Sequence, residues 1–294
     1  MKTLLFILAV LVQPVMALDQ GYDALSFRPT HDRSPYVSLW SSEGLPQYDY
    51  TLSMTGTYAH RPVTVKNAGV KTDFVRSQFL GHLGASFGLY KSILNIGFDA
   101  PVGLVESRET STASFENKVV AGDVRFNLKA KIVDVRRYGV GFSVVPFMTV
   151  PTGYGKQLMG SSQVTGGGLV VLDSIVVPGI AVSLNAGARM RKSFVINGEK
   201  KSHDLFAGLG FSSLLLKNVN LTAEINTHTN LTSPFKDRDL MSVEALGGLR
   251  LQIPGTGVSF LAGGGGGILR GLDTPVYRSV FGITFHNGSA SVWN

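Results

Sequence analysis

The chain has 294 residues, of which 44% are hydrophobic and 16% are charged, and its 35 glycines against 7 methionines favour strands and turns over long helices. It contains no cysteine, which excludes disulfides and a lipid anchor on cysteine. The net charge of +7 is moderate and spread out, because Arg136–Arg137 and Lys200–Lys201 are isolated basic pairs, and this pattern disfavours nucleic-acid binding.

Residues 1–17 have the layout of a secretory signal peptide. Lys2 supplies the positive start, Leu4–Val12 the apolar run, and Val15–Ala17 the small-residue cleavage site. The apolar run is too short to span a bilayer as a helix, and no run of about twenty apolar residues follows it. The sequence therefore predicts an exported chain, either a soluble periplasmic protein or an outer-membrane barrel.

Residues 18–47 are polar and contain Pro29, Pro35 and Pro46, with one possible short strand at Tyr36–Trp40. Two interpretations of this segment remain open. It is either a periplasmic lead-in to the following strands or a segment that folds into the lumen of a barrel.

The first strong pattern is Tyr48–His60, where apolar and polar residues alternate. This period of two predicts a strand with one apolar face and one polar face. The apolar face has Tyr48 and Tyr58 near its ends, with Leu52 and Met54 between them. Aromatic rings at both ends of a hydrocarbon stretch are typical of a strand that faces lipid.

The same alternation recurs along the chain and predicts about twelve strands. Its clearest copy is Val119–Val133, and it fades in the glycine run Gly263–Gly267, which we interpret as close strand packing or a flexible strand end. The predicted strands are Tyr48–His60, Phe74–Leu89, Ser92–Ala100, Val119–Val133, Tyr138–Val150, Val164–Asp173, Ile180–Arg191, His203–Leu216, Val219–Thr229, Leu240–Ile253, Gly257–Leu269 and Val276–Phe285.

The connections alternate in length, being long and polar after odd strands and short after even ones. Outer-membrane barrels sort their connections in this way, with short turns in the periplasm and long loops outside. We therefore predict an all-β fold, a transmembrane antiparallel up-and-down β-barrel of about 12 strands over residues 48–285, multi-pass in the cell outer membrane. An even strand count places both termini, including the tail 286–294, in the periplasm. Closure requires Tyr48–His60 to pair with Val276–Phe285, because a membrane sheet cannot leave an edge exposed.

Four segments resemble the N-terminal barrel of OmpA-like outer-membrane proteins of Gram-negative bacteria. They are FRPTHDRSPYVSLWSSEGLPQYDYTLSM at Phe27–Met54, AGDVRFNLKAKI at Ala121–Ile132, VPFMTVPTG at Val145–Gly153 and TPVYRSVFGITF at Thr274–Phe285. Members of that family usually continue into a globular domain that holds peptidoglycan. Only His286–Asn294 follow the barrel here, so that function is not expected, and a stand-alone porin-like or transporter barrel is the closer analogue.

The last predicted strand also resembles the signal that the outer-membrane assembly machinery reads, with Phe285 in the key position. The residues of this predicted assembly signal are Tyr277, Phe281, Ile283 and Phe285. The expected partners are therefore the assembly machinery, outer-membrane lipid and lipopolysaccharide.

The size of the barrel leaves its lumen open to two interpretations. Barrels of about eight strands are filled by their own side chains, and those of roughly sixteen or more enclose an aqueous channel. The predicted inward residues include eight cations and five acids, a surplus of three positive charges that suggests a mild preference for anions. Alternatively, these charges pair across a filled lumen. The predicted pore-lining residues are Arg76, His82, Asp99, Arg125, Lys129, Lys131, Arg189, Arg191, Glu224, His228, Glu244, Arg250 and Arg278, and the two further inward acids are Asp123 and Asp204.

Catalysis is not expected. His82 and Ser86 share a face but lie four residues apart on one strand, roughly 13 Å, which is too far for a nucleophile and its base. Glu224 and His228 have the same spacing. The sequence lacks a Gly-x-Ser-x-Gly elbow and metal-ligand spacing, and Gly263–Gly267 lacks the Gly-Lys-Ser/Thr of a phosphate loop. We therefore expect no enzyme activity, cofactor or metal.

Two functions remain. The first is a porin-like passive channel for small hydrophilic solutes. The alternative is a structural or surface-interaction barrel with a filled lumen and no transport.

Overall fold

The computed structural model describes residues 27–67, 70–107, 118–153, 159–161, 163–196, 199–236 and 240–288. The predicted signal peptide at 1–17 lies outside the described residues, as do residues 18–26 and the end of the tail, 289–294.

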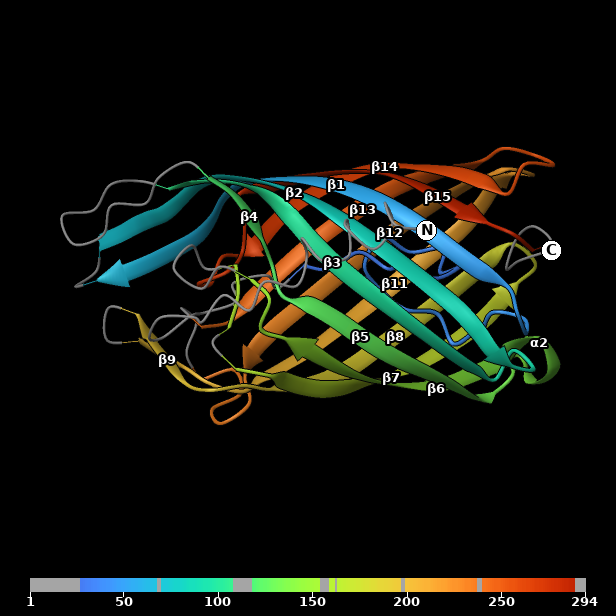
Figure 1. Ribbon diagram of the computed structural model, residues 1–294, viewed down its shortest axis with the longest axis horizontal. Helices are drawn as coiled ribbons and strands as arrows, with labels where there is room; N and C mark the ends of the chain where they lie inside the picture. The colour runs from blue at the N-terminus through green and yellow to red at the C-terminus, as the bar shows by residue number, and fades with distance from the viewer. Residues whose placement is uncertain are drawn as a thin grey trace, which may run out of the picture.

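The described strands form a closed antiparallel barrel, seen from the side in Figure 1. Two of them, β4 and β5, follow each other along one position of the wall, so the barrel has twelve positions, and the predicted fold class is confirmed. The strands of the wall are β1 (Tyr50–Asn67), β2 (Val70–Tyr90), β3 (Leu94–Ser107), β4 (Lys118–Ala121), β5 (Val124–Val133), β6 (Val140–Val150), β7 (Thr165–Val177), β8 (Ile180–Met190), β11 (Asp204–Leu216), β12 (Val219–Asn230), β13 (Ser242–Gln252), β14 (Val258–Leu269) and β15 (Tyr277–His286).

Three short elements lie at the two ends of the barrel. The hairpin of β9 (Phe194–Ile196) and β10 (Glu199–Lys201) stands at the end with the long loops, on the left of Figure 1. The one-turn helix α2 (Val135–Tyr138) links β5 to β6 at the end with the short turns. No helix in the described residues is long and apolar enough to cross a membrane.

The barrel is closed by the pairing of its first and last strands. Residues Thr51 to His60 of β1 pair with His286 to Tyr277 of β15 without a register shift. The predicted pairing is confirmed. It satisfies the backbone N–H and C=O groups of both strands, which lipid cannot do.

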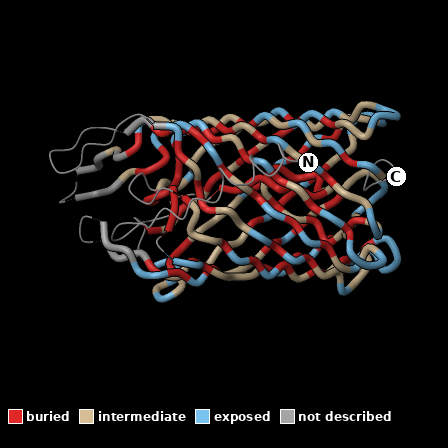
Figure 2. Tube along the Cα trace, viewed as in Figure 1, coloured by how far each residue is buried: buried red, intermediate tan, exposed pale blue. Residues whose placement is uncertain are grey.

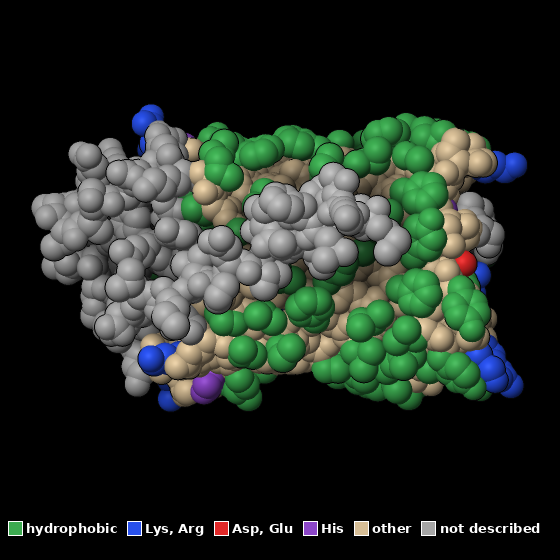
Figure 3. All heavy atoms as spheres, viewed as in Figure 1, with side chains coloured by type: hydrophobic (Ala, Val, Ile, Leu, Met, Phe, Trp, Pro, Cys, Tyr) green, Lys and Arg blue, Asp and Glu red, His purple; other side chains and the backbone are tan. Residues whose placement is uncertain are grey.

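The alternation predicted for the first strand is also confirmed. Leu52 and Met54 are 53% and 57% exposed, whereas Thr51 and Thr55 are buried. Figure 3 shows apolar side chains over the visible outer wall, with Lys and Arg gathered at the two ends. This belt is the surface that a barrel presents to hydrocarbon.

Two predicted loops are wrong in part, because strands extend into them. The predicted loop Arg61–Asp73 is largely a hairpin in which β1 and β2 continue to pair as far as Asn67 and Val70, past irregularities near Val63. Similarly, β3 continues to Ser107, inside the predicted loop Pro101–Lys118. The continuation of β3 keeps the alternation, with Val102 and Leu104 exposed and Val105 buried, so a period-two signal was present there and was overlooked.

The glycine run in β14 packs closely against the neighbouring strands. Gly263 and Gly264 pair with Gly248 and Gly247 of β13, and a Cβ on Gly265 would overlap the carbonyl oxygen of Ala245. The run is therefore regular strand at a place where two backbones approach closely.

The lumen contains residues 27–47, hereafter the lumen segment. Figure 2 shows it as a buried trace within the ring of strands. Its residues have no regular helix or strand, and Tyr36, Val37 and Leu45 are at most 2% exposed. The segment folds back on itself, with the Thr30 N–H donating to the carbonyl oxygen of Val37 at 3.1 Å.

Candidate channel lumen

Most of the predicted pore-lining residues lie against the lumen segment or against one another. Arg125, Lys131, His228 and Arg250 are partly buried. The fully buried members are His82, Asp99, Lys129, Arg189, Arg191, Glu224, Glu244 and Arg278.

Arg76 does not follow the prediction. Its side chain is exposed, and its neighbour Val75 is 3% exposed, although Val75 was expected on the outer face. The pairing of β2 with β3 has an irregularity between Val75 and Ser77. An extra residue in one strand reverses the faces on one side of it, so the alternation that is correct from Gln78 onward does not extend to Arg76.

Several inward charges pair within the wall. Arg189 on β8 and Arg191, just after β8, both contact Asp204 on β11, at 2.7 and 2.8 Å. Arg278 on β15 contacts Glu244 on β13 at 2.8 Å. These ion pairs are almost fully buried, so the opposite charge of the partner must compensate each group for its lost contact with water.

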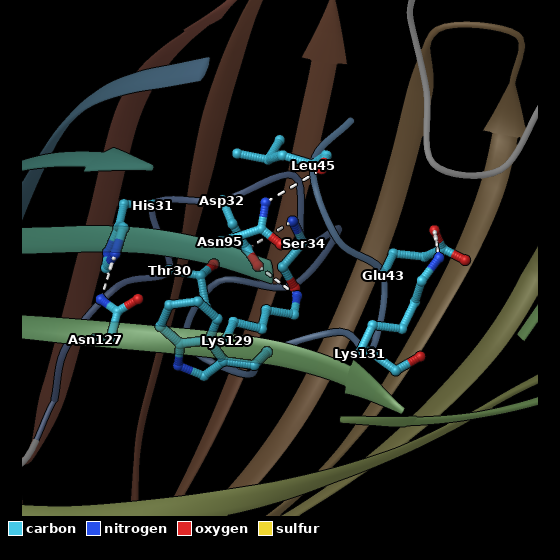
Figure 4. A network of polar contacts seen from close by, with 12 residues as sticks. Thr30, His31, Asp32, Ser34, Glu43, Leu45, Asn95, Asn127, Lys129 and Lys131 are labelled. Carbon is cyan, nitrogen blue, oxygen red and sulfur yellow. Dashed lines mark hydrogen bonds and ion pairs between the residues drawn. The ribbon is translucent and has the colours of Figure 1, made fainter. Parts of the chain in front are cut away.

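Other inward charges pair with the lumen segment. Arg28 donates to Asp99 at 2.7 Å, and Asp99 also accepts a contact from His82 Nδ1 at 3.0 Å. Lys129 Nζ lies 2.8 Å from Asp32 Oδ2. Figure 4 shows Asp32 and Lys129 in the same polar network, with His31 of the segment beside Asn127 of β5.

A third contact lies toward the short-turn end. The Glu43 carboxylate is 3.9 Å from Lys131 and 3.7 Å from Arg136 of α2. Burial raises the pKa of the Glu43 carboxyl, and the two cations oppose that shift. Folding therefore favours the protonated form of Glu43.

Wall side chains also bind the backbone of the lumen segment. Glu224 accepts from the N–H groups of Val37 and Ser38 and from the Ser38 hydroxyl at 2.6 Å. Asn185 binds both the N–H and the carbonyl oxygen of Trp40, each at 2.9 Å. A buried segment without regular structure must find such partners for its backbone, so these contacts fix its path.

Apolar contacts complete the packing. Phe27 and Val37 form a buried cluster with inward-facing residues of three wall strands, namely Leu246, Leu261 and Val280. Trp40 packs against a second cluster formed by β6 and β7. The Arg278 guanidinium lies 4.3 Å from the centre of the Phe27 ring.

Sequence reasoning missed five charged lumen residues: Arg28, Asp32, Arg33 and Glu43 of the segment, and Asp173 of β7, which was assigned to the edge of a turn. Asp173 is 2% exposed and accepts from the Ser42 N–H. A sequence signal for a filled lumen was present in inward apolar positions such as Leu246 and Val280. Apolar side chains are unfavourable on the wall of a water-filled channel, so they indicate that a segment packs against them.

The residues weighed for catalysis have other contacts. His82 Nδ1 contacts Asp99 rather than Ser86, and Glu224 binds the segment backbone. Within the described ranges, no group of three His, Cys, Asp or Glu side chains is placed to hold a metal ion.

The lumen segment separates two cavities. The long-loop cavity has about 950 Å³ of space free of protein atoms, and Arg28, His31 and Trp40 of the segment line it together with wall residues such as Arg189. The short-turn cavity has about 650 Å³, and residues 32–35 of the segment line it together with wall residues beside the short turns. The two cavities lie on opposite sides of the same stretch of chain.

The fold has relatives of known structure. No protein-family model and no curated protein sequence matches the chain. The COG4313 outer membrane channel from Pseudomonas putida F1 is similar in structure, with a TM-score of 0.68 and 13% identity over 86% of this chain and 100% of that one. The NanC porin has a TM-score of 0.54 and 8% identity over 81% of this chain and 100% of that one. At these identities the likeness shows the fold, that of outer-membrane β-barrel channels.

Proposed function

We propose that the protein is a passive channel for small hydrophilic solutes in the outer membrane, closed by the lumen segment and opened when that segment moves. The observation that carries this proposal is the pair of cavities, one at each end of a barrel with a polar inner wall, separated by a segment without regular structure. The resemblance to OmpA-like barrels supports the barrel architecture in this proposal and implies no further activity.

The charge of the wall bears on which solutes would pass. When Arg76 is removed from the predicted inward charges and Asp173 is added, seven cations and six acids remain among these described residues, a surplus of one where three were expected. Most of these charges are paired. An open channel would therefore have at most a weak overall preference for anions.

A structural barrel without transport is the second candidate. The observation in its favour is the number of buried ion pairs and backbone contacts that hold the segment in place, such as Lys129–Asp32 and Glu224 with Val37. If those contacts never break, the lumen stays filled.

Planar-bilayer recordings distinguish the two functions. We expect low or intermittent conductance from the full chain, and a large steady conductance after Phe27–Leu45 is replaced by a Gly/Ser linker of equal length. Heat-modified mobility on gels serves as the control that the variant barrel is folded. A folded linker variant that does not conduct would contradict the channel and favour the structural barrel.

We also propose that both termini face the periplasm and that β15 is the strand which the assembly machinery reads. The outer face of β15 presents Tyr277, Phe281, Ile283 and Phe285, which are 37% to 51% exposed. Protease treatment of whole cells, with cleavage confined to the long-loop end, would support this orientation.

A further inference from the structure

The short-turn cavity contains two guanidinium groups that the fold does not fully satisfy. Arg250 makes one hydrogen bond of 3.3 Å from Nη2 to the carbonyl oxygen of Tyr36, and its buried Nε has no partner. Arg33 contacts Asp49 through Nη2 at 3.0 Å, and its Nε is likewise buried without a partner. Buried donors without an acceptor are costly, so two in one cavity point to an acceptor that enters it.

The charges around these groups favour an anion. Arg33, Arg250 and Lys217 all line the cavity, and the one carboxylate in its lining, Asp32, is engaged by Lys129 at 2.8 Å. In the described part of the chain, Arg250 forms no ion pair with a carboxylate. The local balance is therefore positive, although the wall as a whole is nearly neutral.

The wall beside Arg250 offers hydrogen-bonding groups without charge. Gln252, Ser259 and Thr284 occupy paired positions on β13, β14 and β15, and all three line the cavity. A planar guanidinium beside a row of amide and hydroxyl groups suits an oxyanion, which accepts several hydrogen bonds at once.

We propose that the short-turn cavity is a binding site for a small solute that bears a carboxylate or phosphate group, held by Arg250 with Arg33 and Lys217. The cavity is lined by residues of the lumen segment and of β13, β14 and β15, so a bound solute would contact both the segment and the wall. The site deepens the proposed channel function by naming a solute class, and it rests on that function for its role. Binding itself is measurable whether or not the protein conducts.

Calorimetric titration of the purified full chain with inorganic phosphate and with citrate tests the site. We expect saturable binding of at least one of them and no binding of glucose, and the tighter of the two identifies the preferred anion. R250Q should weaken binding about tenfold or more, because a hydrogen bond to a charged group is lost. The matched control is R125Q, which removes a cation from the long-loop cavity and should leave the affinity within about twofold.

R250Q could weaken binding by disturbing the lumen segment, because Arg250 also donates to Tyr36. K217Q tests the binding site without that effect. Lys217 lies at the turn after β11 and lines the cavity, and none of its contacts in the described structure holds the segment. Weaker binding in both R250Q and K217Q supports the site. Absence of any anion binding, loss in R125Q instead of R250Q, or an unchanged affinity in K217Q would each overturn it. If anions bind but the linker variant does not conduct, the channel fails and the site stands.

Discussion

Lys129 on β5 and Asp32 in the lumen segment form a buried ion pair, 2.8 Å between Nζ and Oδ2, with side chains 2% and 6% exposed. The ammonium also lies 5.6 Å from the centre of the Trp40 ring. One wall residue thereby holds two parts of the segment, on either side of its turn.

Replacing Lys129 with methionine should destabilise the folded protein by roughly 3–5 kcal/mol, because it leaves the Asp32 carboxylate buried and unpaired. Urea unfolding in lipid vesicles measures the change. The matched control is R61M, whose side chain is 51% exposed and lies 3.3 Å from Asp73, and whose loss should cost less than about 1 kcal/mol. Equal effects of the two substitutions would contradict the view that Lys129 anchors the segment.

A disulfide between the segment and the wall should lock the channel shut. A methyl carbon of Val37 lies 3.0 Å from the place where a Cβ on Gly248 would stand, and a disulfide sets about 3 Å between one Cβ and the opposite sulfur. The chain has no other cysteine. Oxidised V37C/G248C should not conduct in bilayers, and reduction should restore the wild-type conductance. The single variant V37C should not respond to oxidant, and conductance in the oxidised double variant would argue against gating by this segment.

Glu43 should make the stability of the protein depend on pH. Burial raises the pKa of its carboxyl in the folded state above the ordinary value of 4.5, so folding favours the protonated form. Its stabilising contribution is complete below the unfolded pKa and is lost as pH rises through the folded pKa. The unfolding free energy of E43Q should therefore equal that of the wild type at about pH 4 and below. Near neutrality, E43Q should have the larger unfolding free energy. The same difference at both pH values would exclude ionisation of Glu43 as its cause.

The lipid-facing belt predicts a depth-dependent cost for charge. Leu128, near the middle of β5, is 38% exposed on the outer wall, and L128R should destabilise the inserted barrel by about 2–4 kcal/mol. Leu216, beside a short turn and 68% exposed, is the control, and L216R should cost less than about 1 kcal/mol. Unfolding from vesicles gives both values, and the reverse order would place the membrane elsewhere on the barrel.

Phe285 should matter for assembly more than for the finished fold. F285A is expected to slow the appearance of the heat-resistant barrel in a pulse-chase experiment, because the terminal aromatic residue resembles the position read by the assembly machinery. Phe260 is an outward-facing aromatic residue of β14 and is 47% exposed, so F260A is the control and should assemble at the wild-type rate. Equal rates in the two variants would remove Phe285 from the assembly signal.

The barrel wall could be predicted from local patterns of residues. Alternation at every second position, as in Tyr48–His60, identified the twelve strands and the pairing of the first with the last. The physical reason is that lipid requires an apolar outer face and a closed sheet, and both requirements leave a regular local pattern.

The contents of the lumen could not be predicted from such patterns. The lumen segment has no period, and its partners are distant in sequence, since Arg28 meets Asp99 and Val37 meets Glu224. A one-residue irregularity turned Arg76 out of the lumen, and the segment's turn brought Arg33 beside Arg250 in one cavity. Such contacts depend on where separate parts of the chain meet in space, and no local pattern of residues records that.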